Sequence, residues 1–471
     1  MTITRRGFLS TSAAFAARPV LTTRAIAAPK VSREADIVVI GAGAAGIAAA
    51  RRIVAENRKV IVLEASSEIG GRCATDVASF EVPFDRGARF MYNPDSNPLV
   101  KQARSEGFDI SELSPGQKIR IGRRFARAGE TEEFLAALVR ANRAIDEAAL
   151  GKVDVSCASS LPKDLGAWAG LAKFVLGPSA TGKDLEDLSA MDKARAQDRS
   201  TFATCRQGLG SLLSKLGERL PLSLSTPAKR IVWSSRDVAV ETAAGKIAAR
   251  AAILTVSTNV LASGALKFEP ELPRRYLDAA AKLSLGSYDH IALQLPGNPL
   301  GLSRDDTLVE QSNSPQTASL LANLGGSSLC LVDVAGSFGR DLTAQGDEAM
   351  VAFALEWLKK MFGSDAAAAV RQTGTTRWNA APYVLGAASA AAPGGQPSRK
   401  ILAEPIGGLY FAGEATHETL WGTLDGAWES GKLAAEAALR RIGVLKEPEP
   451  LRPARRPPPS RRRSRSASPV Y

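Results

Sequence analysis

The sequence is poor in the side chains that proteins most often use to hold metals. Among its 471 residues are two histidines and only four cysteines, Cys73, Cys157, Cys205 and Cys330. These cysteines are far apart and form no CxxC pair, whereas zinc and iron–sulfur sites need several such ligands together. We therefore expect no metal site. Four cysteines in so long a chain also make a poor disulfide framework, although one isolated bridge stays open.

The sequence also has no apolar run long enough to cross a membrane. A spanning helix needs roughly 18 or more uncharged apolar residues. The best candidate, residues 248–266, is interrupted by Arg250 and by several serines and threonines. We therefore expect no membrane span and a soluble mature protein.

The central part of the chain carries no formal net charge, although the whole chain carries +12. Residues 1–30 contain five basic residues and no acidic one, and residues 451–471 contain seven arginines and no acidic residue. Residues 31–450 are therefore formally neutral, which is unusual for a domain that binds nucleic acid, and we expect no such partner. With 45% hydrophobic residues, a chain of this length buries a large core and folds as two or three units.

The first thirty residues have the order of features found in an export signal. A basic segment, Thr4-Arg5-Arg6-Gly7-Phe8-Leu9, precedes a mildly apolar stretch and the small residues Ala25-Ile26-Ala27. Adjacent arginines followed by Phe-Leu are typical of twin-arginine (Tat) signals. We expect residues 1–30 to be a signal peptide that engages the Tat export machinery, which places the protein in the periplasm or outside the cell. The alternative is a fortuitous basic N-terminus.

Residues 448–471 are rich in proline, arginine and serine and have few apolar residues. We expect them to form a disordered basic tail. The tail either binds anionic surfaces or is a tolerated extension.

A βαβ unit is predicted directly after the leader. An apolar strand over 35–40 runs into Gly41-Ala42-Gly43-Ala44-Ala45-Gly46, a helix continues to about residue 55, and a second strand over 60–63 ends at Glu64. In a GxGxxG loop the glycines allow a tight turn, a close approach of the backbone to a pyrophosphate, and packing of the helix on the strand. The acid after the second strand binds the ribose hydroxyls. This combination predicts dinucleotide binding, but the loop alone does not distinguish NAD from FAD.

The rest of the chain alternates helical and strand patterns. Residues 131–220 read as mainly helical, with Phe134, Leu135, Leu138 and Val139 on one predicted apolar stripe. Strands are predicted over 230–233, 238–242 and 251–256, as a pair around 291–295 and 328–332, and over 408–412 before a helix from about 426 to 441.

Two further motifs carry a family resemblance. Gly70-Gly71-Arg72 follows Glu64, and the chain closes with a segment over 408–417 that contains Phe411-Ala412-Gly413-Glu414-Ala415-Thr416, followed by Gly422-Thr423-Leu424-Asp425-Gly426-Ala427. At these residues, and over about 36–439, the sequence resembles the flavin amine oxidase family, which includes monoamine, polyamine and L-amino-acid oxidases. The resemblance implies an α/β fold in which a Rossmann-like FAD-binding domain is interleaved with an α+β substrate domain. The expected FAD-binding parts are 34–90, 203–270 and 399–442, and the expected substrate-binding parts are 91–202 and 271–398.

The resemblance also implies residue roles. Gly41, Gly43 and Gly46 cradle the pyrophosphate, Glu64 binds the adenosine ribose, Arg72 lies along the pyrophosphate and flavin edge, and the backbone of Ile231 meets the adenine. Ala88, Arg89 and Phe90 pass beside the isoalloxazine, Trp378 packs near it, Glu414 binds the ribityl chain, and the amides of Thr423 and Leu424 face the flavin carbonyl. The expected cofactor-binding set is completed by Ala44, Ala45, Ala65, Gly71, Gly87 and Gly413.

The sequence departs from the family pattern at the position of a lysine that faces flavin N5. The segment over 285–293 has His290 there. An imidazole can hold a water or take a proton near neutral pH, so His290 is the expected catalytic residue. The alternative is a strand histidine that is satisfied by its neighbours.

A second departure concerns the aromatic cage that orients the amine in monoamine oxidases. Ala387 stands where those enzymes carry the cysteine that links covalently to FAD, and Thr423 stands where they carry one cage aromatic. The segment before Pro393-Gly394 supplies no aromatic for the other side. We expect non-covalent FAD and no aromatic sandwich.

These features predict an exported FAD-dependent oxidoreductase. It would transfer a hydride from the carbon next to a substrate amine to flavin N5, giving an imine, and O2 or another acceptor would reoxidise the flavin. The first alternative is a flavin dehydrogenase or desaturase that acts on a substrate other than an amine. The second is a non-catalytic partner protein that FAD merely stabilises.

Overall fold

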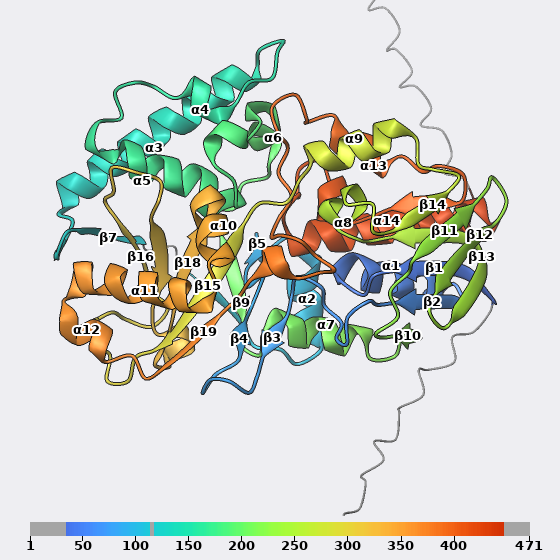
Figure 1. Ribbon diagram of the computed structural model, residues 1–471, viewed down its shortest axis with the longest axis horizontal. Coiled ribbons are helices and arrows are strands. Elements are labelled where there is room, and N and C mark those ends of the chain that lie inside the picture. Colours follow the sequence, from blue (N-terminus) through green and yellow to red (C-terminus); the bar gives the residue numbers. More distant parts are fainter. Residues whose placement is uncertain (1–33, 114–116, 447–471) are drawn as a thin grey trace, which may run out of the picture.

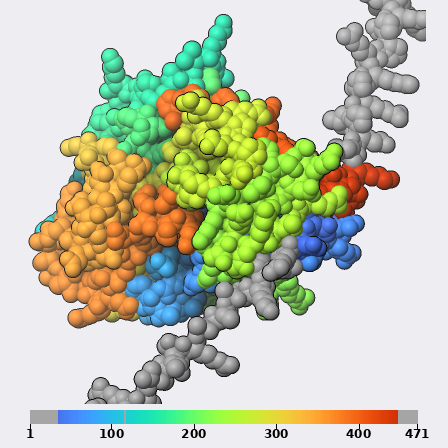
Figure 2. Space-filling view, turned by 45° about the vertical axis from the view of Figure 1, so that its right-hand side comes forward, coloured from blue at the N-terminus to red at the C-terminus, as the bar shows by residue number. Residues whose placement is uncertain are grey.

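Two large sheets lie side by side in the computed structural model, which describes residues 34–113 and 117–446. The eight-stranded sheet lies on the right of Figure 1 and the seven-stranded sheet on the left, with the short strands β3, β4, β5 and β9 between them. Figure 2 shows residues 340–400, in orange, lying against the yellow-green surface of the chain around 240–290. The expected signal peptide (1–30) and basic tail (448–471) lie outside the described residues.

The predicted βαβ unit is present at the N-terminal end of the described chain. β1 (Glu34–Ile40) leads into α1 (Ala44–Ala55), and β2 (Val60–Leu63) runs parallel to β1 with Ile40 opposite Leu63. All four residues of β2 and the last four of β1 are buried. A strand buried on both faces explains why both segments read as continuous apolar runs.

The eight-stranded sheet is assembled from segments far apart in the chain. Its order is β10 (Leu222–Ser223), β2, β1, β13 (Gly245–Leu254), β12 (Val238–Thr242), β11 (Arg230–Trp233) and β14 (Lys267–Glu269), with β20 (Leu409–Phe411) paired to β13. Strands β2, β1, β13 and β20 are parallel, and Ile40, Leu254 and Phe411 lie in one register row. The carboxyl ends of these four strands therefore meet at one edge.

Two helices cover one face of this sheet at very close range. α14 (Leu424–Arg441) lies against α1, and Ala45, Ala49, Ala435 and Ala438 are buried between them. A Cβ at Gly431 would collide with the carbonyl oxygen of Ala45. The helix begins two residues before the predicted 426, because Thr423 caps it by accepting a hydrogen bond from the Gly426 amide.

The seven-stranded sheet is mainly antiparallel. Its order is β19 (Gln372–Thr375), β15 (Tyr288–Gln294), β18 (Leu329–Ala335), β17 (Ala318–Leu321), β16 (Thr307–Glu310), β7 (Gln117–Ile121) and β8 (Arg124–Phe125). The predicted pair is confirmed, since β15 pairs with β18 along its full length. α11 (Asp347–Phe362) packs on this sheet, and its Met350 and Trp357 share a core with Ile291 and Val332.

The predicted helical region holds α3 (Ala128–Ala149), α4 (Cys157–Ser160), α5 (Ala169–Phe174), α6 (Ala190–Arg195) and α7 (Leu209–Gly217). A strand interrupts it: β9 (Phe202–Cys205) pairs with β5 (Met91–Tyr92) and β6 (Ile110–Leu113). The predicted stripe on α3 is partly wrong. Phe134 is buried with Ala137, Ala141 and Ile145, whereas Leu135 and Val139 are exposed, because the helix period turns these two away from the core.

The remaining elements are short. They are α2 (Pro98–Ser105), α8 (Thr258–Ala262), α9 (Arg274–Lys282), α10 (Gly336–Ala344), α12 (Ser364–Ala368), α13 (Ser398–Ala403), β3 (Thr75–Asp76) and β4 (Phe84–Asp85). No helix within 34–113 and 117–446 has the length and apolar character that a bilayer crossing requires. In the same ranges, no three His, Cys, Asp or Glu side chains gather as a metal site, and all four cysteines are free and buried.

Gly431→Ala should destabilise the protein, by about 1–3 kcal/mol, because the added methyl overpacks the contact between α14 and α1. Gly129→Ala is the matched control, since Gly129 also lies in a helix but has open space where the added Cβ would point. That change should leave stability equal or raise it by up to about 1 kcal/mol. Denaturant unfolding of both variants measures the difference, and equal stabilities would contradict the close helix contact.

Candidate functional site

The candidate site lies at the carboxyl edge of the four parallel strands. Gly41 follows β1, Glu64 follows β2, Thr255 follows β13, and Gly413 lies two residues beyond β20. β1 has β2 on one side and β13 on the other, so connections leave it in opposite directions and open a crevice where ligands bind in α/β sheets. A shallow cleft opens at this edge, lined by Arg72, residues 254–258, residues 411–413 and residues 415–416 among others.

The glycine loop combines two crowded positions with one open position. Gly41 has φ of +106°, and a Cβ at Gly46 would collide with the carbonyl oxygen of Gly41, so neither tolerates a side chain. At Gly43 the nearest heavy atom would be 3.8 Å from an added Cβ. Gly43 is also the N-cap of α1, and no side chain caps that helix. The amides of the first turn, at Ala44 and Ala45, therefore face an opening that fits a pyrophosphate.

Glu64 ties the end of β2 to the glycine loop. Its Oε2 accepts a hydrogen bond from the Ala42 amide at 2.7 Å, and its Oε1 accepts one from the Ser66 amide at 2.8 Å. Ala65, between Glu64 and Ser66, is half-buried. The segment that reaches this turn from β10 is 225–226, since the Ser225 and Thr226 amides donate to the carbonyl oxygens of Ser66 and Glu64.

The structure separates Ile231 from this turn. Its side chain is fully buried in the core, and it lies inside β11 with Val240 opposite on one side and Phe268 on the other. Strands β12 and β13 stand between β11 and β1. The adenine contact of the Ile231 backbone stays a prediction, and residues 225–226 are the segment that hydrogen-bonds to the turn at Glu64.

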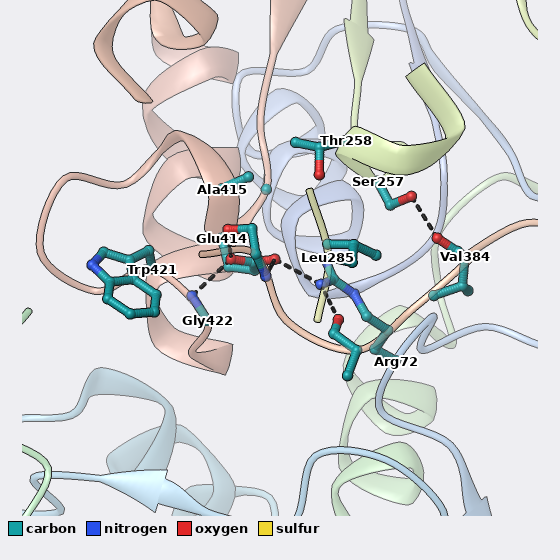
Figure 3. A network of polar contacts seen from close by, with 12 residues as sticks. Arg72, Ser257, Thr258, Leu285, Val384, Glu414, Ala415, Trp421 and Gly422 are labelled. Carbon is teal, nitrogen blue, oxygen red and sulfur yellow. Dashed lines mark hydrogen bonds and ion pairs between the residues drawn. The ribbon is translucent and has the colours of Figure 1, made fainter. Parts of the chain in front are cut away.

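Glu414 is the centre of a buried polar network that joins three segments (Figure 3). Its carboxylate accepts hydrogen bonds from the amide and hydroxyl of Ser389, from the Gly422 amide at 2.7 Å, and from Arg72 Nη1 at 2.6 Å. Arg72 Nη1 also donates to the carbonyl oxygen of Ala387 at 2.6 Å. Burial alone would raise the pKa of Glu414, but Arg72 and Ser389 keep it below its usual value. Beside it, Gly413 has φ of +144° and open space where a Cβ would point.

A second buried ion pair extends this network, and the sequence did not reveal it. Arg399 donates from Nε and Nη2 to the two carboxylate oxygens of Asp192 at 2.6 Å each, and both side chains are fully buried. Arg399 Nη1 donates to Ser389 Oγ at 3.1 Å, and the guanidinium lies 4.7 Å from the Trp421 ring. Because 207 residues separate the two charges, no local pattern signals the pair.

The segment 86–90 runs alongside Arg72. The Ala88 amide donates to the Arg72 carbonyl oxygen at 3.0 Å, and a Cβ at Gly87 would collide with that oxygen. Trp378 packs against the same segment, because its Nε1 donates to the Arg86 carbonyl oxygen at 2.7 Å. Gly71, with φ of +60°, provides the turn into Arg72. The structure thus brings the predicted residues 71, 72, 87, 88 and 378 together.

His290 lies beneath this segment with both ring nitrogens engaged. Nδ1 is 2.7 Å from Asp333 Oδ1, and Nε2 is 3.2 Å from the carbonyl oxygen of Gly87. Arg89 also pairs with Asp333, and the Tyr288 hydroxyl donates to it at 3.0 Å. Burial would raise the pKa of Asp333, but Arg89 and His290 hold it well below its usual value, so it acts as an acceptor. His290 is 2% exposed, and its contacts match the alternative of a histidine satisfied by its neighbours.

The first turn of α14 closes the site. Leu424 is the first residue of the helix, where amides have no intrahelical partner, and both Leu424 and Thr423 are buried. The Thr423 amide is already used, since it donates to the Leu420 carbonyl oxygen at 3.3 Å. Of the two amides expected to face a flavin carbonyl, that of Leu424 is the better placed.

Phe90, which the resemblance placed beside the flavin, belongs to a group of aromatic side chains whose other members the sequence did not point to. Phe90 and Phe202 have ring centroids 4.6 Å apart, and Tyr92 lies 6.5 Å from Phe202. Arg199 lies between Tyr92 and Trp421. The pairing of β5 with β9 brings these residues together, and no spacing in the sequence signals that pairing.

Comparisons with known proteins agree with this geometry. The sequence model for flavin containing amine oxidoreductases matches residues 44–439. The curated relatives include probable polyamine oxidase 4 of Arabidopsis thaliana, which is 26% identical over 86% of this chain and 87% of that protein. They also include human lysine-specific histone demethylase 2, which is 25% identical over 86% of this chain and 53% of that protein.

Solved structures share the fold. Cyclohexylamine oxidase from Brevibacterium oxydans superposes with a TM-score of 0.74 at 21% identity, covering 87% of this chain and 99% of that one. Putrescine oxidase bound to putrescine superposes with a TM-score of 0.73 at 18% identity, covering 86% of this chain and 99% of that one. The expected α/β fold is confirmed.

The contacts of His290 predict a firmly held ring, because Nδ1 lies against Asp333 and Nε2 against the Gly87 carbonyl oxygen. With isotope-labelled histidine, NMR should show a slowly exchanging ring N–H proton that is lost in His290→Gln. The chain has only one other histidine, so His417→Gln assigns the remaining signals. Rapid exchange of every His290 ring N–H proton with solvent would contradict the enclosed contacts.

Proposed function

Because this chain belongs to the family of flavin containing amine oxidoreductases, we propose that it oxidises a small amine to an imine at the carboxyl edge of the eight-stranded sheet. The observation that carries the proposal is the meeting, at that edge, of the open glycine loop with the Arg72 and Glu414 network. FAD is the family's cofactor, and when bound it accepts the hydride from the substrate C–H bond. The imine then hydrolyses in water.

The residues that would hold FAD come from both ends of the chain. The first turn of α1 would bind the pyrophosphate, and Glu64 would face the adenosine ribose from the end of β2. Arg72 and Glu414 would flank the central part of the cofactor. The first turn of α14 would stabilise negative charge through the Leu424 amide, because a helix N-terminus carries a partial positive charge. The uncrowded backbone at Gly43 and Gly413 would let a cofactor approach closely.

His290 is proposed to position the Gly87–Phe90 segment. Its Nε2 holds the Gly87 carbonyl oxygen, and Asp333 fixes the ring while also holding Arg89. A rigid segment keeps the C–H bond of a bound amine aligned, which is the main contribution that a protein makes to hydride transfer. His290 thus replaces the family lysine with a positioning contact.

The cofactor is proposed to bind without a covalent link. Ala387 offers no thiol, and its carbonyl oxygen is held by Arg72. Cys73, next to Arg72, is buried, and burial raises the pKa of its thiol to about 12. A thiol with so high a pKa is a poor nucleophile.

The purified full chain should show the visible absorbance of oxidised flavin, and an amine substrate should bleach it without oxygen. Acid precipitation should release the flavin into the supernatant. Gly43→Val should fold but lose the flavin, because the side chain fills the open space while no protein atom lies closer than 3.8 Å to its Cβ. Gly129→Val is the control, since Gly129 is equally uncrowded but far from the edge in sequence and fold.

The alternatives separate in the same experiment. Bleaching by amines with release of peroxide in air supports an oxidase, and bleaching without peroxide indicates a dehydrogenase that uses another acceptor. Bleaching only by donors that lack an amine would contradict the proposal. A folded protein whose flavin no donor reduces would be a non-catalytic partner.

Export through the twin-arginine pathway is proposed from Arg5-Arg6 and the small residues 25–27. Proteins that use this route fold before export. The proposed FAD site combines residues from the N-terminal and C-terminal parts of the chain, so it forms only in the folded protein.

Replacing Arg5 and Arg6 together by lysine should leave the precursor in the cytoplasm of a bacterial host, while the unchanged chain reaches the periplasm. The matched control replaces Arg18 and Arg24 by lysine, which alters the same chemistry outside the pair. Cell fractionation measures both variants. Equal periplasmic yields from the two would show that the pair is not a signal.

A further inference from the structure

The guanidinium of Arg199 is partly buried between the rings of Tyr92 and Trp421. It lies in the loop between α6 and β9. Its guanidinium carbon is 4.8 Å from the Trp421 ring and 5.6 Å from the Tyr92 ring, and its Nη2 donates to the Trp421 carbonyl oxygen. These contacts fix the guanidinium plane without using most of its donors.

Arg199 has no counterion among the described residues. No carboxylate in 34–113 and 117–446 lies within ion-pair distance of it, and its Nε is buried without a hydrogen-bond partner. Arg399, on the same Trp421 ring at 4.7 Å, is fully paired with Asp192. Burial lowers the pKa of Arg199. A desolvated guanidinium normally has an anionic partner. Arg399 has such a partner and Arg199 has none, which indicates that Arg199 binds an anion that is not part of the described chain.

The nearby carboxylates do not supply that partner. Glu414 is committed to Arg72, Ser389 and the Gly422 amide. Asp425 Oδ1 is buried without a partner of its own, and burial raises the pKa of this carboxyl. The anion that fits Arg199 must therefore come from outside the described chain.

The guanidinium of Arg199 lies beside the segment that leads into α14. Nη1 and Nη2 lie 3.7 and 4.0 Å from the place where a Cβ on Gly422 would be, beside Ala388. Gly422 precedes Thr423, the N-cap of α14. On its other side Arg199 adjoins Tyr92, which contacts Phe90 and Phe202. The cation thus lies between the helix start and a group of aromatic side chains.

We propose that Arg199 binds the carboxylate of the substrate, so that the substrate class is an amine that carries a carboxylate, as an amino acid does. This assignment rests on the proposed amine oxidation and adds the substrate class. A guanidinium binds a carboxylate through parallel charge-assisted hydrogen bonds. The same charge repels a polycation such as a diamine, and the aromatic rings accept an apolar substituent.

The first test needs no turnover. Benzoate and benzamide have the same shape but differ in charge, and each is titrated into the flavin-loaded protein while the visible spectrum is followed. Benzoate should bind about 10-fold tighter or more, the gain expected of a charge-assisted hydrogen bond. In Arg199→Gln the ratio should fall to about 1, and Arg199→Lys should keep part of it. Arg195→Gln is the control, because it removes an equal charge from an exposed side chain nearby.

The second test compares phenylalanine with phenylethylamine, which lacks only the carboxylate. Without oxygen, phenylalanine should bleach the flavin at lower concentration, and Arg199→Gln should abolish or reverse that preference. Equal preference in the unchanged protein and in Arg199→Gln would overturn the assignment. Failure of every amine to bleach the flavin would overturn the proposed function instead, while the benzoate titration still decides the role of Arg199.

The flavin content of the variants distinguishes a substrate-binding role of Arg199 from a cofactor-binding role. Arg199→Gln should retain as much flavin as Arg195→Gln does, because the proposed ligand is the substrate. Loss of flavin from Arg199→Gln alone would mean that the guanidinium serves the cofactor, and the substrate assignment would then be wrong.

Discussion

The site depends on one buried chain of charges. Asp192 pairs with Arg399, Arg399 donates to Ser389, Ser389 donates to Glu414, and Glu414 pairs with Arg72. The two ion pairs join residues that are 207 and 342 positions apart in the sequence. Removing one member of such a buried pair leaves an uncompensated charge, which costs about 3–5 kcal/mol. The network therefore specifies how the loop after β2, the helix α6 and the two C-terminal segments meet, although a hydrophobic core of equal volume would hold them as firmly.

The geometry of the parallel strands decides where that network lies. β1, β2, β13 and β20 end at one edge, so the loops that follow them converge there. Two helix N-termini, those of α1 and α14, begin at loops of the same region, and small residues let the two helices approach closely. The edge therefore offers partial positive charge and uncrowded glycines to a dinucleotide, with the acidic Glu64 at one end.

Contacts between distant segments also place His290 and Arg199. The ring nitrogens of His290 face Asp333 and the Gly87 carbonyl oxygen, so this position of β15 holds a backbone segment. Tyr92 and Trp421 flank Arg199, and Tyr92 in turn contacts Phe90 and Phe202. Charged and aromatic side chains therefore lie together beside the segment that leads into α14.

The sequence by itself determined the βαβ unit, the glycine loop with Glu64, and the motifs that close the site, because these depend on residues near one another in the chain. Through resemblance to a family it also pointed to Trp378 and the segment 87–90, which lie together beside Arg72. Tertiary structure alone decided the Asp192–Arg399 pair, the enclosed contacts of His290, the burial of the Ile231 side chain, and the exposed half of the α3 stripe. Arg399 and Asp192 are 207 residues apart and meet only when the chain folds. Their pairing depends on where each side chain is buried, which the residue type alone does not reveal.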